Sequence, residues 1–347
     1  MKRTLALILA IAMALALVAC GNKQAPSANS GDESVPNTGK TYEWDWCMTG
    51  GKTLMTEIAT EMVEEIKTAT NGQLNITVRL AGEMPYAVSE YLQATSDGSI
   101  AMADCLLSAI SGDLSSGALI ALPMLIENFD DLNTALEVLK DPINNELAAF
   151  NTSMASYYAF PGQQVWGKGA VPASIKDLAG LKVRAQGVEQ SAWLEMNGLV
   201  PTTVNASEVT TSVSRGIIDG IVTAKQSMVG ENWWEVVDWG YLCSMQYIGV
   251  YTVVNNDLLN ELPDDIRATY LEIANKYATE VYPERVGAYD EQMQTELVDL
   301  GLTLVTPPEG EREAQVEMCK DYWNEWCEKK GGNTAEDLAA IVKALGK

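Results

Sequence analysis

The fold is decided by residues 42–80, which read YEWDWCMTGGKTLMTEIATEMVEEIKTATNGQLNITVRL. Residues 42–48 predict a strand that ends at a glycine-rich turn. An amphipathic helix to about Ala69 is expected next, because apolar residues recur every four positions at Leu54, Ile58, Met62 and Ile66. Asn71 and Gly72 end this helix. Apolar and polar residues then alternate as in a half-buried strand, with the apolar set at Leu74, Ile76, Val78 and Leu80.

The same alternation of strands and helices continues along the chain. A helix is expected at 87–95 and a strand at 100–105, after which the middle of the chain reads as helical. The later strands are expected at 181–185, 217–223, 251–254 and 302–305, and the later helices at 188–197, 207–215, 264–300 (interrupted near Pro283) and twice after residue 305. This order predicts an α/β fold with parallel strands and right-handed crossovers. About three hundred residues favour two lobes.

The N-terminus predicts export. Lys2 and Arg3 precede an apolar run over residues 5–19, which would make about 22 Å of helix, short of a ~30 Å hydrocarbon core. Residues 1–19 are therefore expected to be a signal peptide. The run ends in Leu-Val-Ala before Cys20, which resembles the bacterial lipobox, so Cys20 is expected to carry lipid. A chance cysteine after an ordinary signal is the alternative. Residues 20–40 are rich in Gly, Pro, Ser and Asn and are expected to be a flexible tether.

Charge and composition exclude several classes of function. The formal net charge is −24, which argues against nucleic acid and against anionic lipid as partners. The 347 residues contain no histidine, so no Ser-His-Asp or Cys-His catalytic site can form within this chain. No phosphate-binding, nucleophile-elbow or calcium-loop motif is present. We therefore expect a protein that is not an enzyme and that holds no cofactor or metal.

The cysteines after Cys20 are odd in number: Cys47, Cys105, Cys243, Cys319 and Cys327. Cys319 and Cys327 lie eight apart on one expected helix, roughly 12 Å at the helical rise, which is too far for a disulfide. We expect the five to be small buried hydrophobic residues, although the sequence leaves other disulfides open.

Three segments together resemble the solute-binding subunits of tripartite ATP-independent periplasmic (TRAP) transporters. They are PASIKDLAGLKVRAQG (172–187), PTTVNASEV (201–209) and RGIIDG (215–220). Residues 59–84, 97–105 and 255–274 extend the resemblance. It implies a two-lobe periplasmic-binding-protein-like fold with hinge strands and a long helix that spans both lobes. Lobe I would comprise residues 41–160 plus about 251–285, and lobe II about 161–250 plus 286–347.

The resemblance also implies a ligand site in the interlobe cleft. Arg184 matches the arginine with which the family grips a ligand carboxylate, and its planar fork suits both oxygens. A solvent-exposed arginine is the alternative. Thr223 and Gln226 fall where relatives place polar ligand contacts. Gln164 matches a position where some relatives carry a second arginine, whose charge an amide cannot supply. Ala206 replaces a large aromatic residue of many relatives, which would widen the pocket.

Aromatic and acidic residues near expected strand ends complete the candidate site. Trp46, Trp166 and Trp193 make an apolar or aromatic carboxylate a fair hypothesis, with core packing as the alternative. Trp233, Trp234, Trp239, Trp323 and Trp326 fall on expected helices and are read as packing. Asp104 and Cys105, at the end of the third strand, are expected to line the cleft, where Asp104 would accept a ligand hydroxyl or amine.

These observations predict an extracytoplasmic solute-binding protein, held at the bacterial cell membrane only by a lipid anchor. It would capture a small organic acid and deliver it to the TRAP membrane subunits, with no nucleic acid as partner. The alternatives are the binding lipoprotein of an ABC importer or of a ligand-sensing complex. A third class, an exported enzyme on this scaffold, has no motif in its support.

Overall fold

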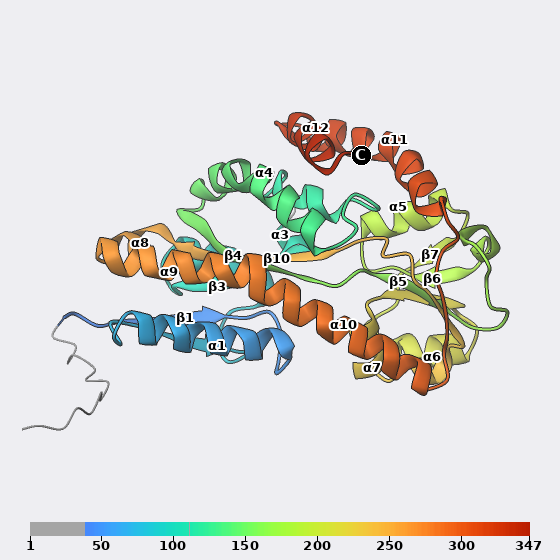
Figure 1. Cartoon of the computed structure of the whole chain (residues 1–347), viewed down its shortest axis with the longest axis horizontal. Helices are drawn as coiled ribbons and strands as arrows, with labels where there is room; N and C mark the ends of the chain where they lie inside the picture. Colours follow the sequence, from blue (N-terminus) through green and yellow to red (C-terminus); the bar gives the residue numbers. More distant parts are fainter. Residues whose placement is uncertain (1–38, 111) are drawn as a thin grey trace, which may run out of the picture. The chain divides into compact units, whose positions relative to one another are not determined.

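The computed structural model describes residues 39–110 and 112–347. The predicted signal peptide, Cys20 and the tether as far as residue 38 lie outside the described residues. Within them, every helix is too short or too polar to cross a membrane. The described chain forms two β-sheets with helices on both faces of each sheet (Figure 1).

The first sheet has the strand order β2-β1-β3-β10-β4. Its strands are β1 (Tyr42–Cys47), β2 (Leu74–Arg79), β3 (Met102–Leu106), β4 (Thr152–Phe160) and β10 (Ile248–Asn255). β1 pairs in parallel with β2 and β3, which confirms the predicted strand–helix–strand unit. β10 is antiparallel to both β3 and β4.

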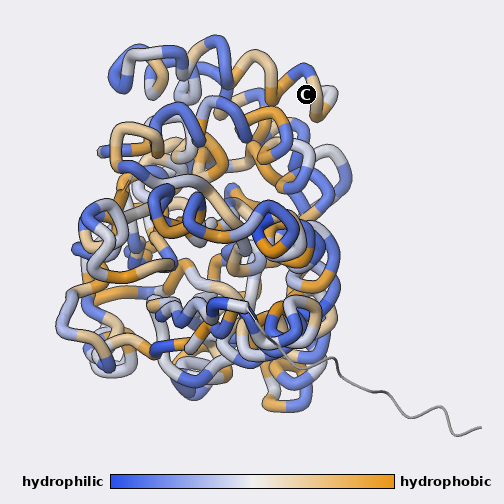
Figure 2. The backbone as a smooth tube through the Cα atoms, turned by 90° about the vertical axis from the view of Figure 1, so that its left-hand side faces the viewer, coloured by the Kyte–Doolittle hydropathy of each residue, from blue (hydrophilic) through white to orange (hydrophobic). Residues whose placement is uncertain are grey.

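Each face of this sheet has its own core. α1 (Leu54–Ala69) and α9 (Asp264–Lys276) cover one face, and α4 (Phe129–Ala148) covers the other. The predicted apolar stripe of α1 is buried, with Ile58, Met62 and Ile66 fully covered. Figure 2 shows hydrophilic and hydrophobic bands alternating along the helices, as expected for helices with one buried face.

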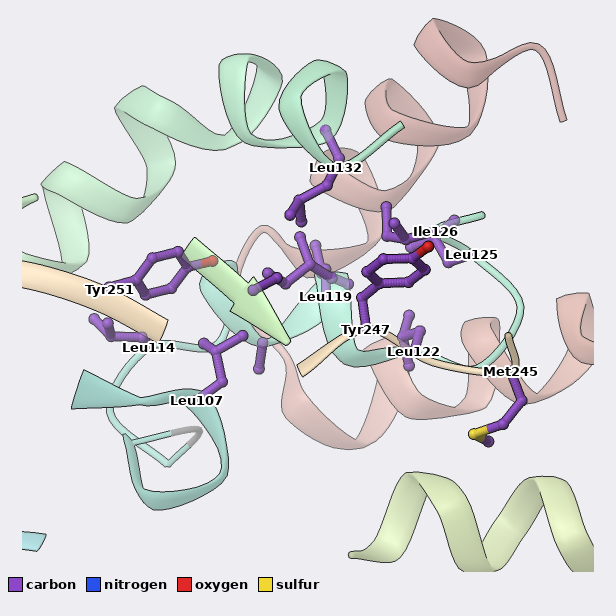
Figure 3. Packing of buried hydrophobic residues seen from close by; sticks show 14 of the residues in the cluster. Leu107, Leu114, Leu119, Leu122, Leu125, Ile126, Leu132, Met245, Tyr247 and Tyr251 are labelled. Carbon is purple, nitrogen blue, oxygen red and sulfur yellow. The ribbon is translucent and has the colours of Figure 1, made fainter. Parts of the chain in front are cut away.

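The segment that precedes α4 packs on β10. It contains α2 (Tyr91–Ser96), α3 (Leu107–Ile110) and the 3₁₀ turn η2 (Gly117–Ala121) at successive positions along the chain. Leu114 lies beside Tyr251, and Leu119 lies near Leu132 and Tyr247 (Figure 3). Tyr251 Oη donates a hydrogen bond to Gly117 O at 2.9 Å.

The second sheet has the order β11-β9-β5-β8-β6-β7. Its strands are β5 (Gln164–Gly167), β6 (Lys182–Arg184), β7 (Val200–Thr202), β8 (Gly220–Thr223), β9 (Trp239–Tyr241) and β11 (Thr303–Val305). β5 is antiparallel to β8 and β9, and the other pairings are parallel. A Cβ on Gly240 would lie 2.3 Å from the Trp166 ring, so β9 can approach β5 only with glycine there.

Helices also cover both faces of the second sheet. α6 (Val209–Ser214) and α7 (Lys225–Gly230) share one core with the turn η5 (Trp233–Val236). α5 (Val188–Met196) and α11 (Glu311–Lys330) contribute to the core on the other face. α8 (Asn256–Glu261) follows β10.

Before α11, three connections join the two halves. The segments after β4 and before β10 pair with each other, since Gln163 N donates to Gln246 O and Met245 N donates to Gln163 O, each at 2.9 Å. The third connection is the continuous helix formed by α9, a π-helical turn at Tyr277–Val281 and α10 (Tyr282–Asp299). This arrangement is the predicted two-lobe fold with hinge strands and a long helix across both lobes (Figure 1).

The structure differs from the sequence prediction in the middle of the chain. The region read as helical contains β4 and β5, and Trp239 lies in strand β9 rather than on a helix. The long helix does not break at Pro283; a π-helical turn directly before it absorbs the missing N–H and the ring clash.

The C-terminal helix bears on the lobe boundaries. α12 (Thr334–Leu345) packs against α4, and Ser116 Oγ donates to the Asp337 carboxylate at 2.7 Å. Lys347 Nζ lies 2.6 Å from Asp131 Oδ2 of α4. We therefore propose that lobe II, expected to extend to residue 347, ends before α12.

Candidate ligand-binding site

Three of the predicted site residues meet at one edge of the second sheet. Arg184 is the last residue of β6 and Thr223 is the last residue of the neighbouring parallel strand β8. Gln164 begins the antiparallel strand β5 and pairs with Thr223. The carboxyl ends of parallel strands are where ligands collect in open α/β sheets.

Arg184 is a buried cation without an acidic partner in the described chain. The residue is only 9% exposed. Among residues 39–110 and 112–347, no carboxylate lies within ion-pair distance of the guanidinium. Nε donates to Val204 O at 3.1 Å, whereas Nη1 is buried without a hydrogen-bond partner. Burial lowers the pKa of the guanidinium. A ligand carboxylate would supply the missing charge and acceptors.

The side-chain amide of Gln164 forms hydrogen bonds with the two segments that connect the halves, one after β4 and one before β10. Its Nε2 donates to Gly162 O at 2.8 Å and to Ser244 Oγ at 3.0 Å, while its Oε1 accepts from Ser244 N at 2.7 Å. These bonds occupy both donors and one acceptor site of the amide. Gln164 therefore supplies no positive charge to the site.

The other predicted site residues of this half lie near the same edge of the sheet. Thr223 is buried, and its carbonyl accepts from Trp166 Nε1 at 2.9 Å. Gln226 is half-buried on α7, directly after the edge. Ala206 is exposed at the start of the 3₁₀ turn η4 (Ala206–Glu208). A surface depression of about 420 Å³ lies beyond β6 on the α5 side of the sheet, and Arg184 is not among its lining residues; these are Ala185, Gln186, Gly187, Val188, Ser191, Ala192, Glu195 and Thr203.

Sequence reasoning missed Lys225, the first residue of α7. Its Nζ lies 2.7 Å from Asp290 Oδ2 of α10, with both side chains largely buried. Burial raises the pKa of Asp290, against the opposing effect of Lys225. The pair joins the strand edge of the second sheet to the long helix. The signal available in the sequence was the position of Lys225, directly after the predicted strand 217–223.

Asp104 lies inside the core of the first sheet. Its Oδ1 accepts from Trp46 Nε1 and Thr252 Oγ1, and its Oδ2 accepts from Tyr158 Oη, each at 2.8 Å. The side chain is fully buried, and burial raises its pKa to about 6 although the three hydrogen bonds lower it. Its acceptors are therefore occupied by protein donors rather than facing solvent.

Cys105 cannot share a pocket with Asp104. Consecutive residues of a strand point to opposite faces, and Cys105 joins the core on the α4 side whereas Asp104 faces Trp46 and Tyr158. Cys105 is buried and free, and burial raises the pKa of its thiol. The other four cysteines of the described chain are also buried and free.

The three candidate tryptophans do not form one surface. Trp46, Trp166 and Trp193 are each fully buried, and they belong to three different core clusters. Trp193 lies on α5 and packs in the same core cluster as α11, with its indole Nε1 unpartnered. By contrast, the Arg184 Cζ lies 5.5 Å from the ring centroid of Trp233, which the sequence had assigned to packing. Among the described residues, no cluster of acidic or cysteine side chains has the form of a metal site.

Comparisons with known proteins agree with this architecture. The family model described as bacterial extracellular solute-binding protein, family 7, matches residues 48–330. A search of curated proteins finds no match.

Solved structures share the fold at low sequence identity. DctP7, an extracytoplasmic solute receptor of Bordetella pertussis binding pyroglutamic acid, is 22% identical with a TM-score of 0.73, over 88% of this chain and 100% of that one. A TRAP periplasmic solute-binding protein of Ochrobactrum anthropi is 16% identical with a TM-score of 0.81, over 88% and 97%. Another from Roseobacter denitrificans, with bound β-D-glucuronate, is 15% identical with a TM-score of 0.71, over 86% and 99%. Since the family model covers most of the described chain, this protein belongs to family 7 of the bacterial extracellular solute-binding proteins.

Proposed function

We propose that this solute-binding protein captures a small organic acid through a single carboxylate and delivers it to a TRAP-type permease. The observation that carries the proposal is the buried, acid-free guanidinium of Arg184 at the strand edge. Pyroglutamate and glucuronate, bound by two relatives of the same fold, each carry one carboxylate. Family membership does not favour the alternative of an ABC importer lipoprotein.

The site would comprise Arg184 with Thr223 and Gln226 as polar contacts, beside the open position of Ala206. A monocarboxylate fits better than a dicarboxylate, because Gln164 is neutral and held by the crossing segments. We assign Trp46, Trp166, Trp193, Asp104 and Cys105 to packing, since each is buried and held within a core. Closure of the lobes would then cover the ligand and favour the ligand-bound state.

The test is replacement of Arg184 with glutamine, which keeps polarity and removes charge. Purified protein is heated with a panel of mono- and dicarboxylates that includes pyroglutamate and glucuronate. Arg184→Gln should lose the ligand-dependent rise in Tm while its ligand-free Tm stays close to that of the wild type. Arg215→Gln, at an exposed arginine of the same half, is the matched control and should keep the full rise. Equal stabilisation of Arg184→Gln and the wild type would refute the role of Arg184.

The proposal extends to the cell envelope. We infer that Cys20 carries the lipid that holds the mature protein outside the cytoplasmic membrane, on the motif that precedes it. Cys20→Ala should abolish the incorporation of labelled fatty acid into the protein. Equal labelling of the variant and the wild type contradicts the lipid anchor.

A further inference from the structure

The guanidinium of Arg184 is held in place from two directions. Its Nε donates to Val204 O at 3.1 Å, which fixes one edge of the fork. The guanidinium carbon Cζ lies over the Trp233 ring, 5.5 Å from the ring centroid, within the range of a cation–π contact. A long arginine side chain otherwise has several rotatable bonds, so these two contacts decide where its free nitrogens point.

Trp233 is itself firmly placed. It is 4% exposed and belongs to the core formed by α6 and α7, where it lies among Val209, Val213 and Met228. The preceding Asn232 has a φ of +54°, a left-handed conformation that asparagine tolerates better than most residues. That turn directs the chain from α7 into η5 and brings the indole beneath the end of β6.

The contact has a consequence for recognition. Arg184 has no carboxylate partner in the described chain, so no ion pair holds its fork in one orientation. A neutral aromatic face can do so without neutralising the charge. An acidic residue in the same place would fix the guanidinium equally well but would compete with an anionic ligand.

We propose that Trp233 is a positioning residue that aims the Arg184 fork at the ligand carboxylate. This inference rests on the proposed function, because it assumes that Arg184 binds the carboxylate. It makes Trp233 part of the anion-recognition apparatus although the tryptophan need not touch the ligand. It also predicts that Trp233 selects for charge and not for the shape of the ligand.

The experiment compares Trp233→Leu, which removes the ring, with Trp233→Phe, which keeps an aromatic face. Trp234→Leu is the matched control, from the same 3₁₀ turn and without a cation contact in the described structure. Affinity is measured by calorimetry for pyroglutamate and its primary amide, and for glucuronate and glucuronamide. Trp233→Leu should weaken carboxylate binding about fivefold to thirtyfold, with a smaller loss in Trp233→Phe, and leave amide binding unchanged.

A second readout needs no ligand. The Nε–Hε signal of Arg184 in the ¹⁵N NMR spectrum, assigned by its absence in Arg184→Lys, should move and exchange faster with water in Trp233→Leu. It should stay in place in Trp234→Leu. This readout decides the inference even when neither pair of probes binds.

The outcomes separate the two proposals. An unchanged Arg184 signal in Trp233→Leu, or equal losses for carboxylate and amide, overturns the positioning role and reduces Trp233 to a packing residue. Loss of binding in Arg184→Gln together with intact binding in Trp233→Leu also overturns that role, while the proposed function stands. Intact carboxylate binding in Arg184→Gln overturns the proposed function itself.

Discussion

Replacing Asp104 with asparagine tests how burial acts on an isolated carboxylate in this fold. The side chain is fully buried, and its neighbours Trp46, Thr252 and Tyr158 are neutral donors. Asparagine keeps an oxygen for Trp46 and Thr252. Its amide can donate to Tyr158 Oη, which is able to accept. The substitution therefore removes the ionisation while preserving the shape of the network.

The magnitude follows from the pKa of Asp104, which burial raises from 3.8 to about 6. The folded state then binds the proton more tightly than the unfolded state does. The wild type therefore loses stability as the pH rises from about 4 to about 6, and the total loss is about 3 kcal/mol at 1.36 kcal/mol per pKa unit. The asparagine variant has no such loss. Its stability relative to the wild type should increase with pH, and roughly 1.4 kcal/mol of that increase should fall between pH 5 and pH 7.5.

The assay is urea unfolding of both proteins, followed by tryptophan fluorescence across that pH range. The other titrating groups are shared by the two proteins and cancel in the difference. Asp141→Asn, at an exposed carboxylate on α4, is the control for the loss of one negative charge. A flat difference for Asp104→Asn would refute the reasoning, because Asp104 would then keep its ordinary pKa in spite of burial.

Two further substitutions probe a contact of the long helix and a contact of the segment before β10. Lys225→Met leaves the Asp290 carboxylate buried and unpaired, so it should destabilise the protein by about 3 kcal/mol in urea unfolding, and adding Asp290→Asn should restore most of this. No recovery in the double variant would contradict the ion-pair explanation. Arg312→Gln removes contacts with the Cys243 carbonyl (3.2 Å) and the Glu127 carboxylate (3.0 Å), so amides of residues 241–248 should exchange faster with deuterium. Unchanged protection of these amides from exchange would show that Arg312 does not stabilise the segment before β10.

The parts of the fold that were predictable are those with strong local periodicity. The four-residue repeat of α1 and the alternation in β2 led directly to the parallel unit that the structure contains. β4 and β5 were missed because their strands are buried on both sides and show no alternation of apolar with polar residues. β9 has the sequence Trp-Gly-Tyr, which shows no alternation of apolar with polar residues.

Of the candidate site, the sequence could place only the residue at the end of a predicted strand. Arg184 could be placed because β6 ends there and the surrounding segment resembles a known family. Gln164 looked like a ligand contact because the sequence does not show that Ser244 would occupy its amide. Strand geometry alone would have separated Asp104 from Cys105, since neighbouring residues of a strand cannot face one pocket. Trp233 could not be assigned to Arg184, because the contact depends on how η5 returns to the sheet.

The charge balance of the chain explains why a single buried cation can carry recognition. With a net charge of −24, the protein repels anions at its surface, so an anionic ligand needs a local cation free of acidic neighbours. Several other lysines and arginines in the described chain form ion pairs, including the largely buried Lys225 and Lys347. A guanidinium that is buried without such a pair carries a desolvation cost that the protein does not offset. Binding of a carboxylate removes that cost, whereas a neutral ligand of the same shape leaves it in place. Under the proposed function, selectivity for acids follows from the absence of an acidic partner at Arg184 as much as from the presence of the arginine.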